Sequence, residues 1–267
     1  MAEASGELRV EQRDALLVIT IDNQKVGNAL SGAAAVELAD VLDEASLGTG
    51  GVRAVLLRSE GKHFCTGADI SGRRGGDSKP VTGHMVRSLA RSHHRAVAST
   101  FGCGVPVVAA VRGAAQGFGL HLALATDFVV AADNASFKAP FSDRGFSVDS
   151  GGSWLIPRLV GLTRAKQMLY FAESIDASTA LGWGLVHQVV ALDDLGATAE
   201  ALAQRLAARP TQVLAATKRL VHDALLTDLD HALHAESMAV ELTLRGNDFK
   251  EGMQAFFEKR PPDFTGT

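Results

Sequence analysis

Two glycine-containing segments, each placed directly after an apolar run, constrain the fold of this 267-residue chain more than any other feature. FCTGADI at 64–70 follows the run Val52–Leu57, and VRGAAQGFG at 111–119 follows the run Pro106–Val111. In both segments glycine stands where a strand is expected to give way to a turn and then a helix. Such turns leave backbone N–H groups without helical partners. Two of them close together would form an oxyanion hole, which is a pair of donors for a developing negative oxygen.

The chain divides into a first part with alternating strand and helix patterns and a second part that is almost wholly helical. Apolar, β-branched runs predict strands at 16–22, 52–58, 106–111 and 127–133. Helical periodicity or composition predicts helices at 33–45, 84–100 and 117–127, with Ser31 or Asn28 as the cap of the first. Beyond about Asp149 only 185–190 resembles a strand. The pattern predicts an α/β protein with an appended helical region.

The composition excludes several classes of function. A formal charge of −4 gives no sign of the basic patches that bind nucleic acid or anionic membranes. Neither a membrane span nor a signal peptide is expected, because no apolar stretch is long enough and the first residues lack an apolar core. The two cysteines make no disulfide framework, and Cys65 is interpreted as a packed thiol rather than a nucleophile. We therefore expect a cytoplasmic protein.

Several pieces of the chain, in the same order, resemble the crotonase family, also called the enoyl-CoA hydratase/isomerase family. These pieces, which extend the resemblance from Leu16 to Phe264, are IDNQKVGNALS, RAVLLRSEGKHFCTGADI, VPVVAAVRGAAQGFGLHLALATDFVVA, GGSWLIPRLVG, ALGWGLVHQVV and EGMQAFFEKRPPDF. The resemblance implies a crotonase-like core over 1–195, in which turns of two strands and a helix wind as a right-handed spiral. It also implies a helical C-terminal region over 196–267, continuous with the core, that forms a homotrimer or a hexamer made of two trimers.

The resemblance further implies that the chain stabilises the enolate of an acyl-CoA thioester. Residue by residue, it assigns the two donors to the backbone N–H groups of Ala68 and Phe118. Coenzyme A would belong to the substrate, so we expect no separate cofactor, and no histidine spacing indicates a metal site. The resemblance also marks positions that would contact coenzyme A. Lys25 and Val26 match contacts near the adenine and phosphates, and Asp69 and Ile70 match contacts near the pantetheine. Phe256 and Lys259 match tail positions that, in relatives, reach the ligand of a neighbouring subunit.

The chain departs from the hydratases of this family at both carboxylates. Their two glutamates, which hold the attacking water, would fall at His121 and Phe141. Phenylalanine cannot transfer a proton, so we expect weak or absent hydration. Asp149 is the acid left near the expected site, and double-bond isomerases of the family carry an aspartate in a similar segment. An aspartate before a helix can also be a simple cap.

Three hypotheses follow for the function. The first is double-bond isomerisation of an enoyl-CoA with Asp149 as the acid and base. The second is hydration, or another enolate chemistry, in which His121 and Asp149 surround a water molecule. The third is an acyl-CoA-binding relative without catalysis. His121 could be a second base, a hydrogen-bonding neighbour of Asp149 or a core histidine. The acyl chain is expected to depend on a mobile loop at Ser71–Pro80 and on the wall near Phe141 and Phe118.

Overall fold

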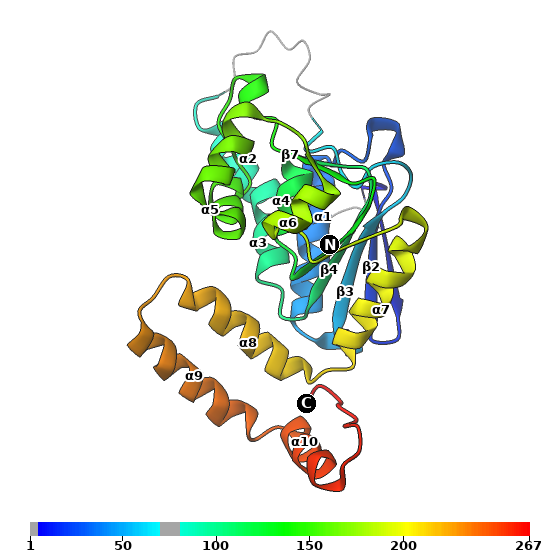
Figure 1. The fold of residues 1–267 in the computed structure, drawn as a ribbon, viewed down its shortest axis with the longest axis vertical. Coiled ribbons are helices and arrows are strands. Elements are labelled where there is room, and N and C mark those ends of the chain that lie inside the picture. Colours follow the sequence, from blue (N-terminus) through cyan, green and yellow to red (C-terminus); the bar gives the residue numbers. More distant parts are fainter. Residues whose placement is uncertain (1–4, 70–80) are drawn as a thin grey trace.

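The computed structural model describes residues 5–69 and 81–267, in which a main sheet carries helices on both faces (Figure 1). The predicted loop at Ser71–Pro80 lies outside the described residues. The sheet has the order β1-β2-β3-β4-β6-β9. Its strands are β1 (Leu8–Arg13), β2 (Leu16–Ile21), β3 (Ala54–Ser59), β4 (Val107–Val111), β6 (Phe128–Ala132) and β9 (Gln188–Val190). β1 is antiparallel to β2 and the other neighbours are parallel, so the carboxyl ends of five strands meet at one edge.

A second, smaller sheet continues from this edge. Its strands, in the order β5-β7-β8, are β5 (Ala114–Gln116), β7 (Ser136–Lys138) and β8 (Ile175–Asp176). β5 begins three residues after the end of β4, and β7 begins four residues after the end of β6. The two sheets are therefore joined through the segments that leave the carboxyl ends of β4 and β6, and one of these segments is the second glycine loop.

The central strands β2, β3, β4 and β6 are buried on both faces, which explains their continuous apolar runs. Along β2, Leu17, Ile19 and Ile21 face the larger core, while Leu16 and Val18 face a smaller one. The helices that contribute to the larger core are α1 (Gly32–Ser46), α3 (His93–Phe101), α4 (Phe118–Leu124), α5 (Gly152–Phe171) and α6 (Ala177–Trp183). The smaller core is closed by α7 (Leu195–Ala207) on the other face.

Most predicted elements are confirmed, with one clear exception among the helices. Ser31 caps α1 by accepting a hydrogen bond from the Ala34 N–H, as predicted. The single helix predicted at 84–100 is wrong, because Ser92 departs from helical dihedrals, with φ −123° and ψ −99°, and separates α2 (His84–Arg91) from α3. The chain also contains short 3-10 helices at Gln24–Val26, Thr49–Gly51, Ser142–Arg144 and Leu192–Asp194.

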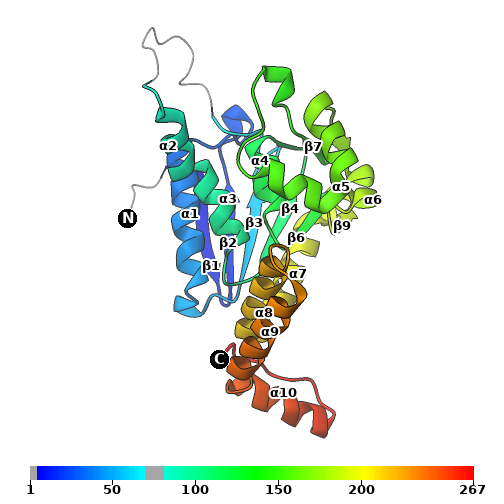
Figure 2. The same cartoon turned by 90° about the vertical axis from the view of Figure 1, so that its left-hand side faces the viewer.

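The last three helices leave the body of the sheet (Figures 1 and 2). They are α8 (Thr211–Ala224), α9 (Leu229–Thr243) and α10 (Asn247–Glu258). The predicted boundary at 195/196 falls at the start of α7, which packs on the sheet, so the projecting region begins at α8. Arg53 ties this region to the core by donating hydrogen bonds to Thr211 Oγ1 and to the carbonyl oxygens of Arg209 and Phe264. Within the described residues, no helix combines the length and apolarity needed to cross a bilayer.

Candidate active site

The two glycine loops lie side by side at the carboxyl ends of β3 and β4. An isolated parallel bridge joins Cys65 to Ala115. The Cys65 N–H donates to the Ala114 carbonyl at 3.1 Å, and the Gln116 N–H donates to the Cys65 carbonyl at 2.9 Å. The predicted juxtaposition of the loops at 64–69 and 111–119 is therefore present.

Glycine is required where these loops approach each other. A Cβ atom at Gly119 would overlap the Cys65 carbonyl oxygen and lie 2.8 Å from the carbonyl carbon. Gly67 has φ +121° and faces the Gln116 carbonyl oxygen, which its Cβ would meet at 3.3 Å. Burial raises the pKa of the Cys65 thiol to about 12, so it stays protonated at neutral pH. The glycines thus serve close contact between the loops, and Cys65 is a packed thiol.

Each loop presents one backbone donor that is not used elsewhere. Leu30 bridges to Ala68 by donating to the Gly67 carbonyl and accepting from the Asp69 N–H, which turns the Ala68 N–H away from Leu30. Phe118 is the first residue of α4, before the first helical hydrogen bond, which His121 makes to Gly117. Among the described residues, neither of these two N–H groups has a hydrogen-bond partner. The arrangement can bind an oxygen that carries negative charge.

Two buried polar side chains brace the loops, and the sequence indicated neither as a site residue. Asn28, with φ +60°, accepts from the Asn23 N–H and donates to the carbonyl oxygens of Glu60 and His63. Asparagine tolerates a positive φ better than most residues. The sequence suggested Asn28 only as a helix cap. His93 on α3 donates to the Leu30 carbonyl through Nε2 at 3.2 Å and contacts Phe118 edge to face at 4.7 Å. Only the fold brings His93 to Phe118 of the second loop and to Leu30, which bridges to Ala68 of the first loop.

Asp149 lies on a turn of unusual geometry before α5. Ser150 and Gly151 both have positive φ, +48° and +82°, and the Gly152 N–H closes the turn on the Asp149 carbonyl at 3.0 Å. A left-handed serine stores about 1–2 kcal/mol of strain. The cap of α5 is Gly151, with no side-chain capping bond, so the alternative that Asp149 caps this helix is wrong. Its half-buried carboxylate has no hydrogen bond or ion pair with any described residue.

His121 and Phe141 form a buried ring pair beside this turn. The two rings are stacked, with their centroids 5.4 Å apart and an interplanar angle of 6°. The ring of Phe141 also packs edge to face on Phe146. Phe141 Cζ lies against Gly117 of the second loop. His121 is 0% exposed, and neither ring nitrogen has a hydrogen-bond partner among the described residues. Burial lowers the pKa of His121 to about 3, so its imidazole is neutral at physiological pH.

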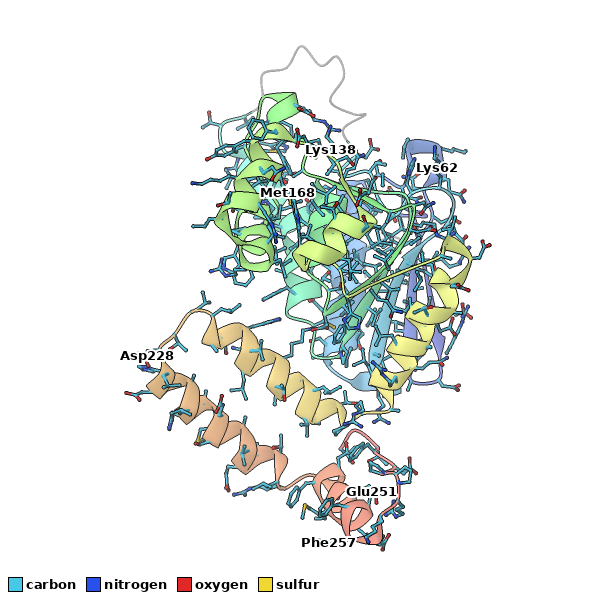
Figure 3. The ribbon with its side chains drawn as sticks, viewed as in Figure 1. Lys62, Lys138, Met168, Asp228, Glu251 and Phe257 are labelled. Atoms are coloured by element: carbon cyan, nitrogen blue, oxygen red, sulfur yellow. The ribbon has the colours of Figure 1, made fainter. Side chains whose placement is uncertain are left out.

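The predicted coenzyme A contacts are distributed over two distant parts of the chain. Lys25 and Val26 are exposed, and Thr66 of the first loop donates to the Val26 carbonyl at 3.3 Å. Asp69 lies on the same loop, whereas Ile70 falls outside the described residues. Phe256 and Lys259 belong to α10 and its end, at the opposite pole from the loops (Figure 3, near the labelled Phe257). The structure of a single chain therefore does not bring these two residues to the site.

Comparisons with known proteins agree with this geometry. The family model for enoyl-CoA hydratase/isomerase matches residues 11–267. A protein named probable enoyl-CoA hydratase from Rhodobacter capsulatus is 39% identical over 97% of this chain and 98% of its own. The 1,2-epoxyphenylacetyl-CoA isomerase of Escherichia coli is 37% identical over 80% of this chain and 82% of its own. The crystal structure of an enoyl-CoA hydratase from Bacillus anthracis superimposes with a TM-score of 0.90 at 30% identity, covering 98% of this chain and 100% of that one. The crotonase-like fold predicted from the sequence is thus confirmed, and the chain belongs to the enoyl-CoA hydratase/isomerase family.

Proposed function

We propose that this protein shifts a double bond in an enoyl-CoA thioester, with Asp149 as the single acid and base. The observation that carries the proposal is the composition of the site around the two loops. Asp149, whose carboxylate has no partner among the described residues, has its backbone beside His121, and the ring of His121 is stacked on that of Phe141. By the family resemblance, these two residues fall at the positions where hydratases hold water with two glutamates. One carboxylate and an oxyanion hole are sufficient for isomerisation.

The proposed reaction begins with a 3-enoyl-CoA whose thioester oxygen accepts hydrogen bonds from the N–H groups of Ala68 and Phe118. The Asp149 carboxylate takes a proton from C2, and the electrons of that bond form the enolate. The negative oxygen is the charge that the two donors stabilise, each contributing about 3 kcal/mol. The conjugated enolate then takes the same proton from Asp149 at C4. The double bond moves from C3 to C2, and no atom is gained or lost.

Replacement of the carboxylate tests the assignment. We expect Asp149→Asn to lower kcat for conversion of a 3-enoyl-CoA to the conjugated 2-enoyl-CoA by about 10³-fold, because general acid–base catalysis contributes about 10²–10⁴. The dissociation constant of the acyl-CoA should be unchanged, since the loops are not altered. Asp143→Asn, which removes an exposed carboxylate paired with Lys138, is the matched control and should keep the wild-type rate. Full activity of Asp149→Asn would overturn the role of Asp149.

Hydration is the second candidate, because His121 has unused ring nitrogens near Asp149. An imidazole whose pKa burial lowers to about 3 is a weak base, and the side chain of Phe141 offers a water molecule no hydrogen bond. We therefore expect little or no 3-hydroxybutyryl-CoA from crotonyl-CoA under conditions where the isomerase assay is active. Tight acyl-CoA binding without turnover of either substrate would favour the non-catalytic hypothesis instead.

We also propose that coenzyme A enters only as part of the substrate and that the chain acts as a homotrimer or a dimer of trimers. The projecting region carries exposed apolar side chains that a single chain leaves in water; among them are Leu226, Leu229, Phe256 and Phe257. Burial of such side chains between subunits would be favourable. Light scattering should give a mass of three or six times the 28.0 kDa chain, and a monomer at micromolar concentration would contradict the proposal.

A further inference from the structure

Within the described residues, the turn that carries Asp149 makes no side-chain hydrogen bond. Gly151, which caps the helix after it, provides no side chain, and the Asp149 carboxylate has no described partner. The turn is closed by the bond from the Gly152 N–H to the Asp149 carbonyl. Two successive left-handed residues, Ser150 and Gly151, make it a conformation that needs support from its neighbours.

The neighbour that provides this support is the ring of His121. A Cβ atom at Gly152 would overlap the His121 Nε2 and would lie 2.7 Å from Val148 Cγ2, so the tip of the imidazole fills the space directly beside the turn. Phe141, whose ring is stacked on that of His121, limits movement of the imidazole as well. His121 is therefore clamped between Phe141 and the backbone of the turn. Both of its nitrogens are buried without a hydrogen-bond partner among the described residues.

A buried imidazole with two unused nitrogens is rare in a native core, because an unpaired polar group loses its hydration without replacement. Burial lowers the pKa of His121, and the backbone of Asp149 beside the ring has the opposite, smaller effect, although no hydrogen bond joins the two.

We propose that His121 is a positioning residue, which holds the 149–152 turn through its ring tip and aims the Asp149 carboxylate at the substrate. The inference rests on the proposed function, because it assumes that Asp149 is the base. It differs from the hypothesis that His121 is itself a base: the imidazole stays neutral and moves no proton. Its contribution is orientation, for which a misplacement of about 1 Å can cost about 10²-fold in rate.

A pair of polar substitutions tests this role without adding volume to the core. Glutamine at position 121 can reach the turn with its amide, whereas asparagine is one bond shorter and cannot. We expect His121→Gln to keep kcat within about threefold of wild type and His121→Asn to lower it by 10-fold to 100-fold. KM and the dissociation constant of the acyl-CoA should stay near wild type in both, because the Ala68 and Phe118 donors are untouched. The pH profile of kcat should keep its shape in His121→Gln, since no proton passes through this residue.

The outcomes separate this inference from the proposed function. Equal activity of the glutamine and asparagine variants, or a loss that appears only in KM, would overturn the positioning role while leaving Asp149→Asn inactive. Loss of the rate in His121→Gln together with a changed pH profile would instead identify His121 as a base. If Asp149→Asn were fully active, the proposed function would fail regardless of His121. Thermal unfolding of each variant checks that the fold is kept, and Asp143→Asn is again the reference for a change outside the site.

Discussion

Gly119→Ala is expected to lower kcat by about 10²-fold or more and to destabilise the protein at the same time. The added Cβ would overlap the Cys65 carbonyl oxygen and lie 2.8 Å from its carbon, and both are backbone atoms that cannot rotate away. The two loops must therefore separate. Separation moves the Phe118 N–H away from the Ala68 N–H, and loss of one oxyanion donor typically costs about 10²–10³ in kcat. Steady-state kinetics with a 3-enoyl-CoA and denaturant unfolding measure the two effects.

The chain contains a matched control for this substitution. Gly196 is an exposed residue near the start of α7, and a Cβ there would meet no atom within 4 Å. Gly196→Ala should leave kcat unchanged and stabilise the protein by up to about 1 kcal/mol, because alanine favours a helix. Wild-type kinetics in Gly119→Ala would contradict the requirement that the two loops touch.

The glycine loops could be predicted from the sequence because their geometry is encoded locally. Gly67 and Gly117 have φ values of +121° and +52°, which glycine adopts readily, and each loop follows an apolar strand buried on both faces. The packing of the loops against each other was inferred from the family resemblance, and the bridge from Cys65 to Ala115 confirms it.

Other features depend on contacts between distant parts of the chain. The break at Ser92 interrupts a segment with a helical pattern, and it places His93 against Phe118 and the Leu30 carbonyl. A helix that packs on the sheet has the same amphipathic pattern as one that packs on a partner, so periodicity could not show that α7 belongs to the core and that the projecting region begins at α8. The strands β5, β7 and β8 have two or three residues each, too few for an alternating pattern to be recognised.

The position of Asp149 shows a similar limit. In the sequence, Asp149 comes before a segment with a helical pattern and so fits a capping residue. In the structure, Ser150 and Gly151 are left-handed, α5 starts only at Gly152, and its cap is Gly151. The family resemblance alone aligned His121 and Phe141 with the two glutamates of the hydratases. The mutual stacking of these two rings, and the complete burial that keeps the imidazole neutral, could be found only in the folded chain.

The burial of His121 should also make stability depend on pH in a way that can be isolated. In the folded protein burial lowers the pKa of His121 to about 3 from an ordinary value of 6.5. Between these values the unfolded chain binds a proton at this residue and the folded chain does not, so protons favour unfolding. The contribution of His121 to stability is therefore complete above pH 6.5 and is lost as the pH falls, by up to about 1.4 kcal/mol per pH unit.

We expect the free energy of unfolding of wild type to fall by about 2 kcal/mol more than that of His121→Gln between pH 6.5 and pH 4.5, because glutamine does not titrate. Urea unfolding of both proteins across this range measures the difference, and the comparison cancels the carboxylates and the other eight histidines. His94→Gln, which removes an exposed histidine from α3, controls for the loss of a histidine as such. Parallel curves for wild type and His121→Gln would mean that solvent reaches the imidazole. That result would contradict a positioning role in which the imidazole stays neutral.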